Sequence, residues 1–271
     1  MSRIAPTARN ARYWMKELAY GTASAVTRVR APTRHPSKII LTYHSHSVSS
    51  PWGVGIADFE RHVSYLRERF HLVPLQELAS RFDDSSEPMA CLTFDDGYLD
   101  NCELTLGVLD RHDVNATFFL IASALGARLP GRSGEALMSA DQARDLVARG
   151  HEVGSHTLSH ADLVKIPRHR ARTEIAESRI ALEDLLSVPV TSIAYPFGRY
   201  DADTKLLAQQ AGCRLGVTTR EASVSNDPDR FALPRVSVNR DVGAMQFRAK
   251  LTPALEVYES WRGRRREGTR A

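Results

Sequence analysis

Four side chains in the sequence have the types and spacing of a hydrolytic metal site. Asp95 and Asp96 are adjacent in the segment TFDDGY (93–98), and His156 and His160 begin and end the segment HTLSH. Two adjacent carboxylates raise the pKa of one of them unless a cation intervenes. Two imidazoles and one carboxylate can hold a divalent metal, most often Zn²⁺, with positions left open for water and substrate. The remaining carboxylate would then be the general base.

Each motif taken alone also has an ordinary structural explanation. An Asp-Asp-Gly tripeptide is common in turns. Histidines four residues apart occur often by chance, although this spacing would place His156 and His160 on one side of a helical turn, within reach of a single ion. It is the combination of the two motifs in one chain that predicts a catalytic metal site.

Alternating strand and helix patterns predict the elements that position these residues. Short β-branched or aromatic runs alternate with segments of helical period, which indicates βα units around a parallel sheet. We expect an α/β fold with about six or seven parallel strands, a barrel rather than an open doubly wound sheet. In both folds, active sites form at the carboxyl ends of the strands. The predicted strands cover residues 39–43, 90–94, 117–121, 151–155, 192–195 and 215–218.

Charge is distributed unevenly along the 271 residues, whose formal net charge is +4. Residues 1–38 hold eight Lys or Arg and one acid, and residues 262–271 hold five Arg and one acid. The central part is therefore net acidic, which argues against nucleic acid as a partner. We expect a basic N-terminal arm (1–37), a catalytic domain (38–245) and a C-terminal helix with a basic tail (246–271).

The basic ends also bear on location. No run approaches the roughly 20 consecutive apolar residues that a membrane span requires, and no convincing signal peptide precedes the first strand. The sequence predicts a cytoplasmic or membrane-peripheral protein. The basic ends could contact an anionic membrane surface, and a disordered arm or a transit peptide is the alternative.

The two motifs, in this order, closely resemble those of the polysaccharide deacetylases with a NodB homology domain, carbohydrate esterase family 4. The resemblance covers roughly residues 38–240 and implies a distorted (β/α) barrel. It also implies that Asp96, His156 and His160 bind the metal and that Asp95 is the general base. The implied activity is removal of the N-acetyl group from N-acetylglucosamine-type glycans or lipid-linked sugars.

The segment YPFG (195–198) resembles the third motif of this family. By that resemblance, the backbone N–H of Phe197 donates to the oxyanion that forms during attack. The family motif begins with an Arg that orients the catalytic Asp, but Ala194 occupies the matching position here. Arg199 and Arg235 are the two candidates to replace it.

A second departure concerns the general acid. The family usually supplies a late histidine, whereas this chain has no histidine after His169. His44, in the segment YHSH (43–46) directly after the first strand, is the natural substitute. A branch that resembles the biofilm poly-N-acetylglucosamine deacetylases has its histidine near the N-terminus in the same way. A structural hydrogen-bonding role is the alternative for His44.

Aromatic residues beside the motifs are candidates to bind the sugar. We expect Tyr98, Tyr195 and Tyr200 to line the substrate site, and Trp52 lies on a loop near His44. Each of these rings could equally be a core or rim aromatic.

Two other functions remain open. The same metal site could act on a small cyclic imide or an O-acetyl ester. A degenerate carbohydrate-binding domain is also compatible with Ala194 and the missing late histidine, although the metal and base residues are all present.

Overall fold

A computed structural model describes residues 19–20, 22, 35–47, 50–84, 86–129 and 134–267. Of residues 261–267 it describes the backbone alone. The chain divides into two compact units, Ser37–Asn239 and a second one formed by Met1–Pro36 with Arg240–Ala271. Each unit is described by itself below.

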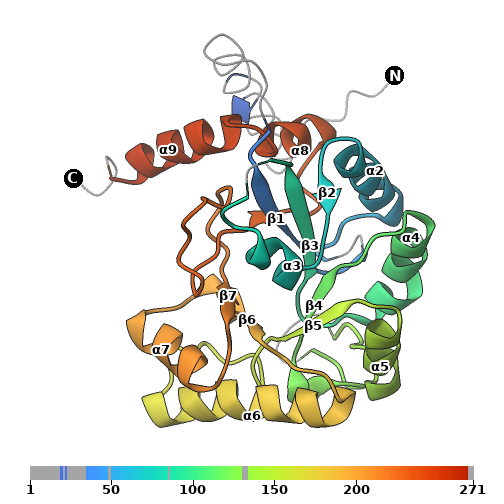
Figure 1. Ribbon diagram of the computed structural model, residues 1–271, viewed down its shortest axis with the longest axis vertical. Coiled ribbons are helices and arrows are strands. Elements are labelled where there is room, and N and C mark those ends of the chain that lie inside the picture. The colour runs from blue at the N-terminus through green and yellow to red at the C-terminus, as the bar shows by residue number, and fades with distance from the viewer. Residues whose placement is uncertain are drawn as a thin grey trace, which may run out of the picture. The chain divides into compact units, whose positions relative to one another are not determined.

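One parallel sheet forms the centre of the first unit (Figure 1). Its strands follow the order β7-β6-β5-β4-β3-β1-β8, and β2 pairs with β3 beside this path. Every pairing between these strands is parallel. The predicted α/β fold and its βα alternation are confirmed. The strands are β1 (Lys38–Tyr43), β2 (His71–Leu72), β3 (Met89–Phe94), β4 (Thr117–Leu120), β5 (Glu152–Ser155), β6 (Ser192–Ala194), β7 (Leu215–Val217) and β8 (Val236–Ser237).

A single segment connects the two ends of this curved sheet. The N–H of Gly216 in β7 donates to the carbonyl of Arg230 at 2.8 Å, and the N–H of Leu233 donates back to Gly216 at 2.9 Å. Directly after Arg235 the same segment becomes β8, which pairs with β1. Residues 230–237 thus bring the sheet close to a closed, distorted barrel.

Helices surround the outer face of the sheet (Figure 1). The longest is α6, and α5 begins at a capping box formed by Ser139 and Gln142. A π-helical turn at Asn101–Thr105 leads into α4. The helices of this unit are α2 (Ile56–Arg67), α3 (Leu75–Ser80), α4 (Leu106–Arg111), α5 (Ala140–Ala148), α6 (Arg168–Leu186) and α7 (Ala202–Gln210).

The inner face of the sheet is an apolar core at one end and polar at the other. Ile40, Cys91, Phe119 and Val217 come from four strands and pack in one buried cluster with the apolar residues of α3. Because side chains on a strand alternate between faces, the residues at even steps further along point to the same interior. This alternation directs His44, Asp95 and His156 inward, at the carboxyl ends of β1, β3 and β5.

The second unit contains α8 (Ala244–Lys250) and α9 (Ala254–Glu267). Tyr20 stacks on Tyr258 with ring centroids 4.0 Å apart, and Nδ1 of His35 donates to the carbonyl of Leu251 at 2.9 Å. Among the described residues, no helix has the length and apolar character of a membrane span. Most of the predicted basic arm, and the side chains of the C-terminal arginines, lie outside the described residues.

Candidate active site

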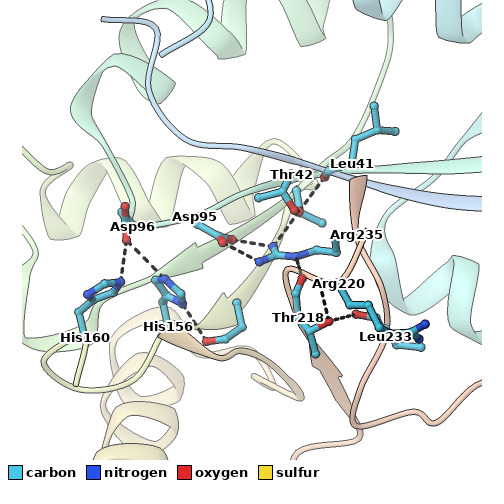
Figure 2. Close-up of polar contacts among 12 residues, drawn as sticks. Leu41, Thr42, Asp95, Asp96, His156, His160, Thr218, Arg220, Leu233 and Arg235 are labelled. Atoms are coloured by element: carbon cyan, nitrogen blue, oxygen red, sulfur yellow. Dashed lines mark hydrogen bonds and ion pairs between the residues drawn. The ribbon is translucent and has the colours of Figure 1, made fainter. Parts of the chain in front are cut away.

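The Asp-Asp-Gly segment turns sharply as it leaves β3. Asp96 has φ 71° and Gly97 has φ 77°. Asp tolerates this left-handed conformation better than most residues. A Cβ on Gly97 would lie 2.9 Å from a methyl carbon of Leu120. Both the positive φ and this lack of space therefore require glycine at position 97. The turn sends the two carboxylates to different partners (Figure 2).

Asp96 faces the two predicted metal-binding histidines. Its Oδ1 lies 3.4 Å from Nε2 of His156 and 3.3 Å from Nε2 of His160 (Figure 2). One ligand atom from each residue can be chosen so that all three lie within 4.8 Å of one another. Nδ1 of His156 is 2.8 Å from the carbonyl of Ala194. Because a carbonyl only accepts, Nδ1 carries the proton and Nε2 presents its lone pair to the cluster.

The chemistry of this donor set fits a zinc ion. Both carboxylate oxygens of Asp96 are buried and have no hydrogen-bond partner. Buried carboxylates are normally paired, so this one is expected to serve a cation. Burial alone would raise the pKa of Asp96, but the neighbouring histidines lower it below its usual value, so the ligand is ionised. Two nitrogens and one oxygen with positions left open match a catalytic zinc site.

The histidine pair lies on a loop, so its predicted placement on a helical turn is wrong. Thr157 has φ 66° and His160 has φ 62°, both incompatible with a right-handed helix. Glu174 of α6 binds this loop. Its carboxylate accepts from the N–H of Ser159 at 2.8 Å and from the Ser159 hydroxyl at 2.6 Å. Its backbone carbonyl also accepts from the N–H of Leu158 at 3.0 Å.

We expect Glu174→Ala to weaken zinc binding about 10- to 100-fold, the usual effect of removing a group that orients metal ligands. The substitution removes both side-chain acceptors of Ser159, so the left-handed conformation of His160 loses its support. The measurement is a competition titration of zinc against a chromophoric chelator.

Glu177→Ala is the matched control, because Glu177 is an exposed acid on the same helix. It should bind zinc as wild type does. Equal zinc affinity of Glu174→Ala and wild type, at an unchanged melting temperature, would show that the loop does not depend on Glu174.

Asp95 is held by Arg235, which approaches from the segment before β8. The guanidinium donates from NH1 to Oδ1 at 2.8 Å and from NH2 to Oδ2 at 2.7 Å. Its remaining donors reach the carbonyl of Thr218 at 2.9 Å (Figure 2) and the hydroxyl of Thr93 at 3.0 Å. Burial alone would raise the pKa of Asp95, but Arg235 and then His156 lower it below its usual value.

Of the two arginines that the sequence offers in place of the motif Arg, Arg235 is the one that pairs with Asp95. Arg199 forms an ion pair with Asp162 instead, and half of its side chain is exposed. Ala194 packs in the interior cluster with Phe119, and the guanidinium of Arg235 lies 5.6 Å from the Phe119 ring centroid. The Arg missing from position 194 is thus supplied 41 positions later in the chain.

Comparison with known proteins identifies the family. A family model described as polysaccharide deacetylase matches residues 83–216. YxkH of Bacillus subtilis (strain 168), named as a polysaccharide deacetylase, is 30% identical over 222 residues, which cover 80% of this chain and 77% of YxkH. The chain belongs to the polysaccharide deacetylase family. The predicted enzyme class, a hydrolase that removes acetyl groups from carbohydrates, is confirmed.

Two further relatives extend this finding. A chitooligosaccharide deacetylase of Sinorhizobium fredii is 34% identical over 131 residues, which cover 46% of this chain and 54% of that one. The structure of the deacetylase PplD of Streptococcus pyogenes, in complex with acetate, matches 81% of this chain and 100% of PplD, with a TM-score of 0.71 and 24% identity. The second likeness confirms the predicted distorted (β/α) barrel of the polysaccharide deacetylases.

Phe197 lies beside the cluster of Asp96, His156 and His160 in this deacetylase. Its ring centroid is 4.8 Å from that of His160, and its backbone is left-handed with φ 60°. Among the described residues, four of the six non-glycine residues with positive φ belong to the site: Asp96, Thr157, His160 and Phe197. Such concentrated strain is typical of a functional site. The donor role of the Phe197 N–H stays a prediction.

His44 also reaches the site. The carboxylates of Asp95 and Asp96 act to raise the pKa of its imidazole, but burial outweighs them and the pKa is lowered. The neighbouring His46 has a structural role: Nδ1 donates to the carbonyl of Val54 at 2.7 Å, and Nε2 lies 2.6 Å from the Thr105 hydroxyl. Because the ring of His46 is held by structural hydrogen bonds, His44 is the candidate acid of the two histidines in YHSH, and this role stays a prediction.

Two of the three predicted substrate-binding tyrosines, Tyr98 and Tyr195, are buried in the core. Tyr98 is 1% exposed in a small cluster with Leu129 and Leu137, and Tyr195 is 1% exposed beneath Tyr200, with ring centroids 5.5 Å apart. Both rings thus take the core position that the sequence left open as the alternative, and a substrate-binding role for Tyr98 and Tyr195 stays a prediction. Tyr200 is partly buried against the same cluster as Tyr195.

Proposed function

We propose that this deacetylase removes the N-acetyl group from N-acetylglucosamine-type glycans or lipid-linked sugars, with Zn²⁺ held by Asp96, His156 and His160. The observation that supports this proposal most is that the two adjacent aspartates, Asp95 and Asp96, face different partners. One is a buried carboxylate without a hydrogen-bond partner that faces two imidazoles, and the other is clamped by an arginine. The first arrangement suits a metal ligand and the second suits a general base.

Bound zinc would supply Lewis acidity for the attacking water and the acetamide carbonyl. Asp95 then accepts the proton of that water, and Arg235 fixes the orientation of both its oxygens. The N–H of Phe197 donates to the oxyanion. His44 gives a proton to the nitrogen as the carbon–nitrogen bond breaks, so that acetate and a free amine leave.

Acetate release from a panel of acetylated sugars tests this proposal. We expect purified protein to release acetate from N-acetylglucosamine oligosaccharides, to lose at least about 10²-fold of that activity on chelation, and to regain it with Zn²⁺. An O-acetylated sugar in the same panel separates the ester alternative. If zinc-loaded protein releases acetate from no N-acetylated member, the proposed substrate is wrong.

A further inference from the structure

Two large exposed aromatic side chains stand out on the described surface, and both contact an imidazole of the active site. Trp52 is 38% exposed and Phe197 is 46% exposed. The indole of Trp52 stacks on His44 with centroids 5.4 Å apart and an interplanar angle of 28°. Phe197 contacts His160, which belongs to the cluster of Asp96, His156 and His160. Trp is enriched at interfaces, where one part of its ring is buried and another part faces water.

The loop that carries Trp52 is fixed at both of its ends. The N–H of Val54 donates to the carbonyl of Ser45 at 2.9 Å, and His46 donates to the carbonyl of Val54. A Cβ on Gly53 would lie 1.8 Å from the carbonyl oxygen of Ser47, so the chain passes too closely for any side chain there. These contacts hold the described part of the loop in place, and the side chain of Trp52 stays 38% exposed there.

The start of the loop is anchored to the helical turn after β3. The carboxylate of Asp100 accepts from the Ser45 hydroxyl at 2.6 Å and from the N–H of His46 at 2.7 Å. The side-chain amide of Asn101 donates to the carbonyl of His44 at 2.8 Å. His44 and Trp52 are thus positioned as a pair relative to the segment that carries Asp95 and Asp96.

We propose that Trp52 is a substrate-binding residue, whose indole stacks on the hexosamine ring that bears the acetamido group. The inference rests on the proposed function. The acid must reach the amide nitrogen, and this nitrogen is bonded directly to the sugar ring. The sugar ring therefore lies on the side of His44, where Trp52 is exposed, and the acetyl carbonyl lies on the side of Phe197. Apolar faces of sugar rings stack well on aromatic side chains.

Kinetics on an N-acetylglucosamine pentasaccharide test this assignment. We expect Trp52→Leu to raise KM about 10-fold, equivalent to about 1.4 kcal/mol, with kcat changed less than about 3-fold. Trp52→Phe should stay within about 3-fold of wild type in KM, because it keeps an aromatic face. The pentasaccharide should also bind zinc-free Trp52→Leu more weakly than zinc-free wild type in calorimetry, by a similar factor.

Ile180→Ala removes another exposed apolar side chain, on α6, and should leave KM unchanged. Comparison of the Leu and Phe variants at equal zinc content and melting temperature separates ring stacking from loop stability. If both variants keep the wild-type KM, Trp52 does not bind the sugar, although the enzyme would still be a deacetylase. If wild type itself releases no acetate, the proposed function has failed instead.

Discussion

Replacement of Asp95 by Asn is expected to lower kcat for acetate release about 10²- to 10⁴-fold while zinc stays bound. Removal of a positioned general base typically costs this much. Asn has nearly the same shape as Asp but cannot accept a proton from the attacking water. Asp95 is also absent from the set of residues that could hold the metal, so the zinc affinity should change little. The measurement combines single-substrate kinetics with zinc content per chain.

Asp162→Asn is the matched control for this substitution. Asp162 is a nearby carboxylate, 14% exposed in its side chain and paired with Arg199 rather than with Arg235. Its substitution should change kcat less than about 5-fold, because its partner Arg199 is half exposed and ion pairs open to solvent contribute little. A zinc-loaded Asp95→Asn enzyme that retains more than a tenth of wild-type kcat would assign the base elsewhere.

The sequence could predict the central part of the site because local patterns determine it. Alternation along strands, with the strand ends at Tyr43, Phe94 and Ser155, is sufficient to place His44, Asp95 and His156 at one mouth of a barrel. The Asp-Gly pair indicates a left-handed turn, which separates the two carboxylates. These local patterns could not predict the conformation of the loop that carries His156 and His160. That conformation depends on Glu174, which lies on a helix that carries no motif.

Long-range contacts explain the other differences between prediction and structure. The partner of Asp95 lies 140 positions away on a segment with no strong strand period, since β8 has only two residues. Residue type alone could not tell which aromatic rings face solvent. Tyr98 and Tyr195 lie next to motif residues yet fill the core, whereas Trp52 lies on the outer loop beside His44.

The Arg235–Asp95 pair should dominate the electrostatics of the interior. Arg235→Met is expected to lower the free energy of unfolding by about 3–5 kcal/mol, because it leaves the charge of Asp95 buried without a partner. The side chain of Arg235 is 0% exposed, so water cannot compensate for the loss. Urea unfolding of zinc-free protein measures the effect without a contribution from metal binding. Arg235→Lys should also be destabilised, since an ammonium cannot form the bidentate contact.

A double variant distinguishes this explanation from a simple packing defect. Asp95→Leu/Arg235→Met buries no charge at this position and should be more stable than either single variant, because apolar replacement of a buried ion pair is often neutral. Arg199→Met breaks the ion pair of a half-exposed arginine and should cost less than about 1 kcal/mol. If the double variant is no more stable than Arg235→Met, the loss comes from packing around Thr93 and Phe119. In that case the unpaired charge of Asp95 is not its cause.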